Sequence, residues 1–204
     1  MITIIDYGIG NLRSIEKAFE HVSSGVIRTD DPEIIQQADR LVLPGVGAFG
    51  ACIHEVRQRQ LEQPIFDAIA RKVPFLGVCV GMQMLFESSS EKGQHTGLGL
   101  LEGHVKELKP EDSALKVPHM GWNMISPVRA TPLLNGLPEN AYCYFAHSFY
   151  ATKANPNDVI ATTEYGSSLP VAFARDNIYG VQFHPEKSHE VGLQILSNFG
   201  ELRA

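Results

Sequence analysis

The sequence predicts an α/β fold in which a mostly parallel central sheet is flanked by helices and continues into an antiparallel C-terminal portion. Two observations support this prediction. Short runs that are apolar on both faces recur along the chain, as expected for strands that helices cover on both sides. Helical periodicity separates these runs over about the first ninety residues, whereas the later runs follow one another with few helical interruptions.

The expected strands are bounded by glycine, proline or aspartate. They are Ile2–Ile5, Leu41–Leu43, Phe75–Val78, Tyr142–Ala146, Val159–Thr163, Val171–Ala174 and Tyr179–Phe183. The polar segment Glu107–Leu115 is expected to be a surface loop. No internal repeat, low-complexity segment or linker divides the chain, so we expect a single domain over residues 1–204.

The expected helices carry apolar residues at helical spacing. In the first, apolar positions recur at i, i+3, i+4 and i+7 between Leu12 and Val22, and Asn11 is a plausible N-cap. Three further helices are expected. One begins after Ala48, one runs through Ile65–Ala70 and one spans Val191–Leu202.

Composition narrows the class of protein. The net charge of −6 argues against broad electrostatic contact with nucleic acid. No apolar run approaches the ~18 residues of a membrane span, and Asp6 ends the first apolar run too early for a signal peptide. The three cysteines, Cys52, Cys79 and Cys143, are odd in number and widely spaced, which argues against a disulfide framework. We therefore expect a cytoplasmic protein.

The stretch around Cys79 has the layout of a nucleophile elbow. The apolar run Phe75–Val78 leads into Cys79, and a helical pattern follows at once. A sharp strand-to-helix turn needs residues without bulk, which Gly77 and Gly81 supply. The turn would lift the sulfur out of the sheet beside a helix N-terminus and aim the Val80 N–H at a tetrahedral oxyanion. A buried structural cysteine between two packing glycines is the alternative interpretation.

A cysteine nucleophile needs a base, and His184 with Glu186 can supply both the base and the carboxylate that orients it. His184 follows an apolar run and so lies at the sheet edge, where α/β proteins place their sites. His147 is the rival base, but no carboxylate follows it closely. A metal site at His184, Glu186 and His189 is not expected, because Pro185 interrupts any helical ligand face.

These segments together resemble the class I, triad-type glutamine amidotransferases, which have a flavodoxin-like fold. The matching motifs are Gly77–Gln83 and Phe183–Glu186. The resemblance implies Cys79 as nucleophile, His184 as general base and acid, and Glu186 as its orienter. It implies no cofactor and no metal.

The resemblance extends from the first strand to the last helix. Leu43–Phe49 resembles the oxyanion strand, and its Pro-Gly-Val-Gly form is similar to the imidazole glycerol phosphate synthase branch of the family. Three further segments resemble the same branch: Asp6–Ser14, His119–Asn123 and His184–Ser188. Val80 stands where leucine is usual and Phe149 where tyrosine is common, and both replacements are apolar.

The resemblance also implies the surroundings of the nucleophile. Backbone N–H groups near Gly45, Val46, Gly47 and Val80 would stabilise the oxyanion. Gln83 and Glu91 would bind the polar end of glutamine, helped by the backbone of Ser148 and Phe149. Val46 stands between two glycines, so its backbone can adopt two peptide orientations, and we expect weak activity without a partner.

The partner that the resemblance implies is a (β/α)8-barrel cyclase subunit, bound as a heterodimer. It would receive the ammonia through a dry passage and make imidazole glycerol phosphate and aminoimidazole carboxamide ribotide in histidine biosynthesis. The interface candidates are Asn11, Trp122, Asn123 and Lys187.

Other functions are compatible with parts of the sequence. They include the glutaminase subunit of another class I amidotransferase such as pyridoxal phosphate synthase, a cysteine peptidase or esterase, and a scaffold subunit with an inactive site. Gly8 and Gly10 after the first strand are similar to a dinucleotide-binding turn, but Arg13 stands in place of its third glycine.

Overall fold

An eight-stranded sheet forms the centre of the computed structural model, which describes residues 1–110, 112 and 114–203. Its strands are β1 (Ile2–Ile5), β2 (Val26–Thr29), β3 (Leu41–Leu43), β4 (Phe75–Val78), β9 (Ser126–Pro127), β12 (Val159–Glu164), β13 (Ser168–Arg175) and β14 (Ile178–Val181). Their order is β2-β1-β3-β4-β14-β13-β12-β9. The pairs from β2 to β14 are parallel and those from β14 to β9 antiparallel, which confirms the predicted fold class.

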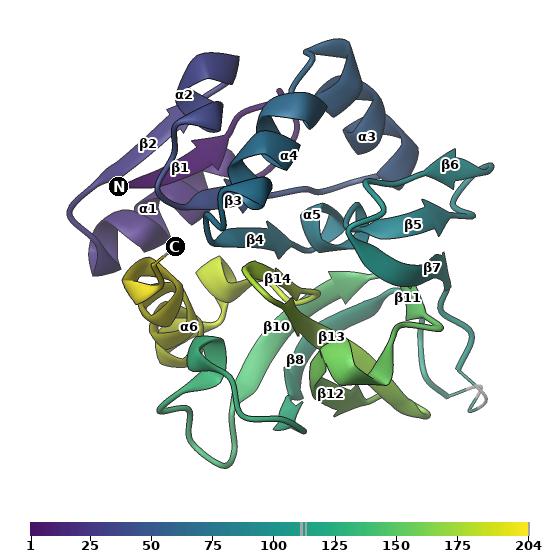
Figure 1. Ribbon diagram of the computed structural model, residues 1–204. Helices are drawn as coiled ribbons and strands as arrows, with labels where there is room; N and C mark the ends of the chain where they lie inside the picture. Colours follow the sequence, from purple (N-terminus) through teal and green to yellow (C-terminus); the bar gives the residue numbers. More distant parts are fainter. Residues whose placement is uncertain (111, 113, 204) are drawn as a thin grey trace.

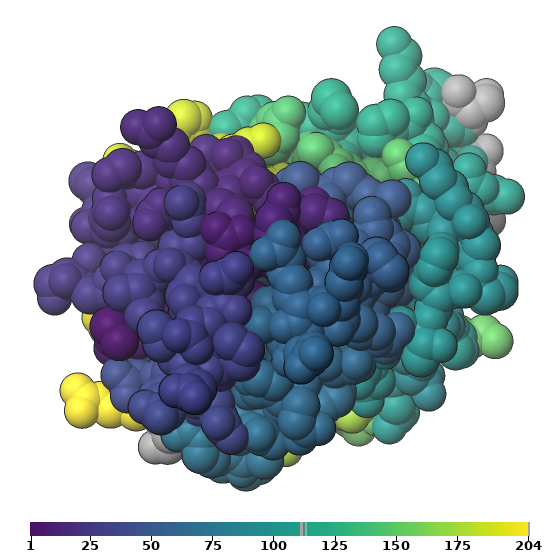
Figure 2. Space-filling view, turned by 90° about the horizontal axis from the view of Figure 1, so that it is seen from above, coloured from purple at the N-terminus to yellow at the C-terminus, as the bar shows by residue number. Residues whose placement is uncertain are grey.

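Helices cover both faces of this sheet, which explains why β1, β3 and β4 are apolar at nearly every position and buried throughout. The helices are α1 (Leu12–Val22), α2 (Pro32–Gln36), α3 (Phe49–Gln58), α4 (Glu62–Ala70), α5 (Val80–Gln83) and α6 (His189–Glu201). Figure 1 shows α2, α3 and α4 on one side and α6 on the other. There α1 and α6 meet through Phe19 and Phe199, whose ring centroids lie 6.1 Å apart. In Figure 2 the first half of the chain, purple to blue, forms most of the upper face.

Two smaller sheets complete the fold. β5 (Phe86–Ser89), β6 (His95–Thr96), β7 (Leu101–Glu107) and β11 (Phe149–Thr152) form one of them, in the order β11-β7-β5-β6. β8 (His119–Met124) and β10 (Tyr142–His147) pair antiparallel and are called the β8–β10 ribbon below. The ribbon lies beside β12 and α6 (Figure 1). Short 3-10 turns occur at Pro132–Leu134, Pro156–Asp158 and Pro185–Lys187.

Several strands were not predicted from the sequence, and each is short, polar or only half covered. β2 has no fully buried position, and β8 exposes every second residue. In the expected loop Glu107–Leu115, Glu107 ends β7, and residues 111 and 113 lie outside the described residues. The expected strand at Tyr179–Phe183 ends instead at Val181, although Gln182 and Phe183 are still buried.

Asn11 occupies the N-cap position of α1, but its side chain does not cap the helix. Its Oδ1 accepts a hydrogen bond from the Ser14 hydroxyl at 2.8 Å. The prediction was right about the position and wrong about the capping contact.

Within the described residues, no helix is both long and apolar enough to cross a membrane.

Candidate active site

Cys79 lies on a strained turn between β4 and α5. Its backbone has φ 55° and ψ −113°, a conformation that L-residues rarely adopt and that recurs at functional sites. Its N–H donates to the Val181 carbonyl at 2.8 Å, which ties the turn to β14. A Cβ on Gly81 would collide with the Leu43 carbonyl oxygen, and one on Gly77 would lie 2.7 Å from the Met82 Cα. The close approach of β3 to α5 therefore requires Gly81, and the close approach of β4 to α5 requires Gly77.

The helix after Cys79 differs from the expectation. α5 has only 4 residues, so few peptide dipoles align behind the sulfur. The expected helix-dipole effect on the thiol is therefore small, and nearby side chains must supply most of the electrostatic field.

Sheet topology explains why Cys79 and His184 lie at the same place. β4 and β14 are parallel neighbours in which Gly77 pairs with Gly180 and Val78 with Val181. Because the carboxyl ends of parallel neighbours meet at one sheet edge, the residues that follow them come together. Cys79 and His184 both line a cavity of about 350 Å³ at this edge.

His184 is bonded to Glu186 within the same short turn. Its Nδ1 lies 2.9 Å from Glu186 Oε1, and the two side chains are only 6% and 3% exposed. Burial alone would lower the pKa of His184, but hydrogen bonds to Cys79 and Glu186 and their negative charge raise the pKa to about 10. Glu186 Oε2 is buried and has no hydrogen-bond partner among the described residues. The imidazole thus holds a proton between two acidic groups.

The backbone of His184 is fixed by two residues that sequence reasoning missed. The His184 N–H donates to the Tyr144 carbonyl at 2.9 Å. The Ser188 hydroxyl donates to the His184 carbonyl at 2.6 Å and accepts from the Tyr144 N–H at 3.0 Å. These contacts join the histidine turn to β10. A serine two positions after Glu186 was the available signal.

The expected oxyanion strand lies against the elbow in a closed arrangement. The Val80 N–H donates to the Gly45 carbonyl at 3.3 Å, so this carbonyl occupies the donor that an oxyanion would need. Gly45 permits the approach, because a Cβ there would lie 2.6 Å from the Gly81 nitrogen. Gly47 has φ +80°, which favours glycine, and both Val46 and Gly47 line the cavity.

Two further residues hold the carbonyls on either side of the Gly45–Val46 peptide. The Tyr7 hydroxyl donates to the Pro44 carbonyl at 2.7 Å, and the Cys52 thiol lies 3.3 Å from the Val46 carbonyl. Neither residue was identified from the sequence. Between these anchors, the Gly45–Val46 peptide has the backbone freedom to reorient.

The expected glutamine contacts are only partly brought together. Gln83, Glu91 and Ser148 line the cavity, whereas Phe149 does not. Gln83 is 3% exposed, and its Nε2 donates to the Phe149 carbonyl at 2.9 Å and to Gln182 Oε1 at 3.0 Å. Glu91 Oε2 accepts from the Phe49 N–H at 2.7 Å. Gln182 was missed, although a polar residue in an apolar run was a usable signal.

His147, the rival base, lines the cavity but has no free ring nitrogen. Its Nδ1 lies 2.9 Å from the Phe149 carbonyl and its Nε2 lies 3.0 Å from Nδ1 of His119. Burial lowers the pKa of His147 to about 4. A neutral ring with both nitrogens engaged is poorly suited to move protons at Cys79.

The interface candidates fall into two groups. Trp122 is 46% exposed and stacks on His189 with centroids 4.8 Å apart, and Lys187 has its Nζ 5.6 Å from the Tyr144 ring centroid. Asn11 is exposed on another element, and Asn123 turns inward.

Within the described ranges, no group of three or more histidine, cysteine, aspartate or glutamate side chains is placed to hold a metal ion.

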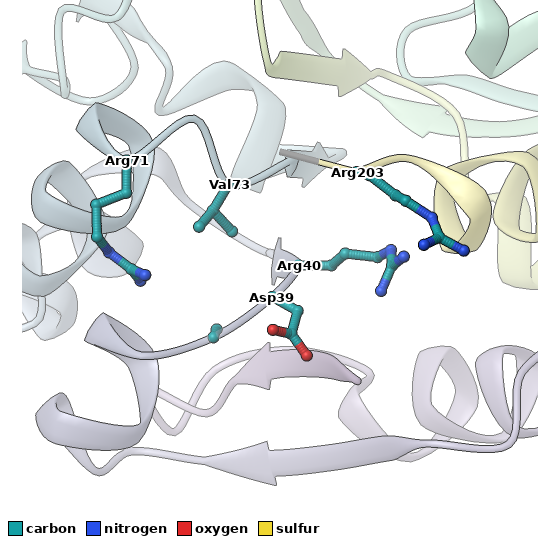
Figure 3. A pocket seen from close by; sticks show the side chains of 6 residues that line it. Asp39, Arg40, Arg71, Val73 and Arg203 are labelled. Atoms are coloured by element: carbon teal, nitrogen blue, oxygen red, sulfur yellow. The ribbon is translucent and has the colours of Figure 1, made fainter.

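A larger cavity, of about 440 Å³, lies at the opposite edge of the sheet (Figure 3). Arg40 and Val73 precede β3 and β4, whereas Cys79 follows β4. The other lining residues are Ala38, Asp39, Arg71 and Arg203. Its one acidic residue, Asp39, is paired with the N-terminal ammonium at 3.0 Å, whereas the smaller cavity brings a thiol and an imidazole together and is therefore the candidate active site.

Comparison with known proteins identifies the family. The chain belongs to the class I glutamine amidotransferases, because the family profile "Glutamine amidotransferase class-I" matches residues 3–201. Among curated relatives, it is 60% identical to the imidazole glycerol phosphate synthase subunit HisH of Salinibacter ruber, over 99% of this chain and 94% of the relative. It is 46% identical to the subunit of the same name from Syntrophotalea carbinolica, over 99% of this chain and 100% of the relative. The resemblance inferred from the motifs is confirmed.

Solved structures agree on the fold. PurLQS from Thermotoga maritima matches 97% of this chain and 96% of the solved chain, with a TM-score of 0.74 and 20% identity. The glutaminase domain of CTPS from Trypanosoma brucei matches 100% of this chain and 94% of the solved chain, with a TM-score of 0.68 and 14% identity. At this level of identity the likeness concerns the fold alone.

Proposed function

We propose that the chain is the glutaminase subunit of an imidazole glycerol phosphate synthase and that Cys79, His184 and Glu186 carry the reaction. It hydrolyses glutamine to glutamate and ammonia in histidine biosynthesis. The observation that carries this proposal is the meeting of Cys79 and His184 in one cavity, with Glu186 Oε1 2.9 Å from His184 Nδ1. The full-length match to the amidotransferase family argues against a peptidase or esterase.

The geometry supports a two-step reaction. The sulfur of Cys79 attacks the carboxamide carbon of glutamine, and the carbonyl electrons move to the oxygen. His184 then gives its proton to the leaving nitrogen, the C–N bond breaks and ammonia departs, leaving a glutamyl thioester. Water attacks the thioester and yields a proton to His184, and glutamate leaves as the sulfur recovers its negative charge. Glu186 holds the imidazole in place and stabilises its charged form.

Oxyanion stabilisation needs the Val80 N–H to be free. In the closed arrangement this donor is bonded to the Gly45 carbonyl. Turning the Gly45–Val46 peptide would release Val80 and aim the Val46 N–H toward the cavity. One such donor contributes roughly 3 kcal/mol in comparable sites. Weak activity of the isolated chain follows from this arrangement.

Gln83 and Glu91 are suited to bind the polar end of glutamine. Both N–H donors of the Gln83 amide are already engaged, so its oxygen is the atom left for a ligand. Glu91 keeps a carboxylate oxygen that the Phe49 N–H does not use. Two acceptors suit the α-ammonium group of an amino acid, with the backbone around Ser148 close by.

A partner is expected on the outer face of the β8–β10 ribbon, which is apolar and exposed. Met120, Trp122 and Met124 on β8 alternate outward and are 63%, 46% and 37% exposed, and Tyr142 opposite Met124 is 49% exposed. Such a patch is typical of a protein–protein contact. Met120 and Lys187 also line the cavity, so a partner seated there would lie next to the ammonia source.

The cyclase that fits this role is a (β/α)8 barrel bound as a heterodimer. Ammonia in water at neutral pH is mostly ammonium, which is not nucleophilic. Direct transfer from the cavity into the partner would keep it unprotonated.

Glutamate release tests the proposal. The purified chain, alone and with the barrel cyclase and its nucleotide substrate, is assayed beside Cys79→Ala. We expect strong hydrolysis only in the loaded complex and none in the variant. Brisk hydrolysis by the isolated chain would contradict the expected dependence of activity on the partner. Equal rates for Cys79→Ala and wild type would reject the proposal.

A further inference from the structure

Two buried histidines face each other on the inner side of the β8–β10 ribbon. His119 and His147 are directly paired across the strands and are 3% and 5% exposed. Nδ1 of His119 lies 3.0 Å from Nε2 of His147. The His119 ring stacks between Phe145 and Tyr165, with centroid distances of 4.6 Å and 4.0 Å. The reaction outlined above uses neither imidazole.

The hydrogen bonds at both ends fix every proton of this pair. The Phe149 carbonyl can only accept, so Nδ1 of His147 carries a proton and its Nε2 is the acceptor. His119 must then donate from Nδ1, which leaves its Nε2 to accept from Asn123 Nδ2 at 3.3 Å. The Asn123 amide is itself fixed, because Nδ2 donates to the Glu164 carbonyl and Oδ1 accepts from the Met124 N–H. One tautomer of each ring satisfies the whole chain.

The pair stays neutral at physiological pH. An added proton would turn an accepting nitrogen into a donor facing another donor. Burial lowers the pKa of both histidines to about 4. The rings therefore act as fixed hydrogen-bonding groups and not as proton carriers.

The chain of hydrogen bonds ends at the wall of the glutamine cavity. The Phe149 carbonyl accepts from His147 Nδ1 and from Gln83 Nε2, both at 2.9 Å. Gln83 also donates to Gln182 Oε1, and Gln182 Nε2 lies 3.8 Å from the Cys79 sulfur. One carbonyl thus joins the histidine pair to the residue that faces the substrate.

We propose that His147, backed by His119, is a positioning residue for glutamine. It holds the Phe149 carbonyl so that the Gln83 amide keeps its oxygen toward the substrate. This role rests on the proposed glutaminase function and adds two residues to it. Because the same ribbon exposes Trp122 on its other face, the wall of the substrate cavity and the expected partner surface are built on the same two strands.

Two amide substitutions of His147 separate this role from simple packing. In His147→Asn the amide nitrogen can take the place of Nδ1 and keep the bond to the Phe149 carbonyl. In His147→Gln the side-chain amide extends to the place of Nε2 and keeps the bond to His119 but loses the one to Phe149. Both are tested in the complete complex with the cyclase, by measuring kcat and KM for glutamine.

We expect His147→Asn to retain a KM within about threefold of wild type. His147→Gln should raise KM about tenfold, with a much smaller change in kcat, which corresponds to the loss of one hydrogen bond of about 1.4 kcal/mol. Equal KM values for the two variants, or a fall in kcat alone, would overturn the proposal.

His119 provides a second pair of variants farther from the cavity. His119→Asn keeps a donor toward His147, whereas His119→Leu removes it at similar volume. A higher KM in His119→Leu than in His119→Asn supports the chain of hydrogen bonds, and no difference contradicts it.

The tautomers themselves provide a test that does not depend on activity. Long-range proton–nitrogen NMR of the wild-type protein should show both rings protonated on Nδ1 only. The other tautomer in either ring overturns the positioning role even in a fully active enzyme, whereas wild-type protein inactive in the loaded complex rejects the glutaminase proposal itself.

Discussion

The carboxyl edge of β4 and β14 and the β8–β10 ribbon meet at the same cavity but are built differently. At the sheet edge every strand position is buried, and the ladder between parallel strands fixes where Cys79 and His184 lie. In the ribbon, alternate positions face outward as an apolar surface and inward as a polar chain that contains His119 and His147.

This difference suggests that the sheet edge and the ribbon have separate functions. A fully buried edge can hold reacting groups in a strained geometry, as the backbone of Cys79 shows. A ribbon with one exposed apolar face can bind a partner and, through its inner face, shape the substrate cavity. Changes at the edge should therefore affect kcat, and changes in the ribbon should affect partner affinity and KM.

The largest effect is expected at the nucleophile. Cys79→Ala should lower glutamine hydrolysis in the complex about 10⁴-fold or more, because no other group can form the thioester. Glutamate release measures this, and partner binding verifies that the variant is folded.

Alkylation provides a control for the same residue. Cys52 and Cys143 are fully buried, and burial raises the pKa of both thiols, that of Cys143 to about 12. Iodoacetamide should thus modify Cys79 alone in the folded wild type and modify nothing in Cys79→Ala. Loss of activity with the label on Cys52 would contradict the assignment.

A smaller loss is expected at the orienting carboxylate. Glu186→Gln should lower kcat about 10²–10⁴-fold, because a neutral amide no longer stabilises the charged imidazole and can turn its NH2 toward Nδ1, which leaves the ring in the wrong tautomer. The negative charge of Glu186 raises the pKa of His184, so the variant should also shift the pH profile of kcat to lower pH. Glu190→Gln makes the same change at an exposed position and should leave the profile as in wild type.

The prediction for the β8–β10 ribbon concerns the binding of the cyclase, and the hydrolytic reaction at Cys79 should be unchanged. Trp122→Ala should weaken the Kd for the cyclase about 30-fold, a typical cost of about 2 kcal/mol for removing an aromatic anchor. Ile34→Ala removes a 39% exposed side chain on α2 and serves as the control. A normal Kd for Trp122→Ala, measured by titration calorimetry, would remove the ribbon from the interface.

The last prediction concerns the pH dependence of stability, which is measured without turnover. The pKa of His184 is raised in the folded protein from 6.5 to about 10. Its contribution to the free energy of unfolding is therefore fully present below pH 6.5 and is lost as pH rises toward 10. Urea unfolding should show the advantage of wild type over His184→Asn shrinking across this interval. An advantage that grows with pH would contradict the raised pKa.

The sheet edge was more predictable from sequence than the ribbon. Apolar runs and the two glycines around Cys79 indicated the bounds of β1, β3 and β4 and the elbow, because local patterns determine them. β8 was missed, because Met120, Trp122 and Met124 face outward and leave no buried run. The bonds of Tyr7, Gln182 and Ser188 were also missed, because they join segments far apart in the chain.

The most direct test of the account is labelling with a diazoketone analogue of glutamine, followed by mass spectrometry of the protein. We expect one adduct, on Cys79, that forms much faster when the loaded cyclase is bound than in the isolated chain. An adduct on any other residue, or the same rate with and without the partner, would contradict it.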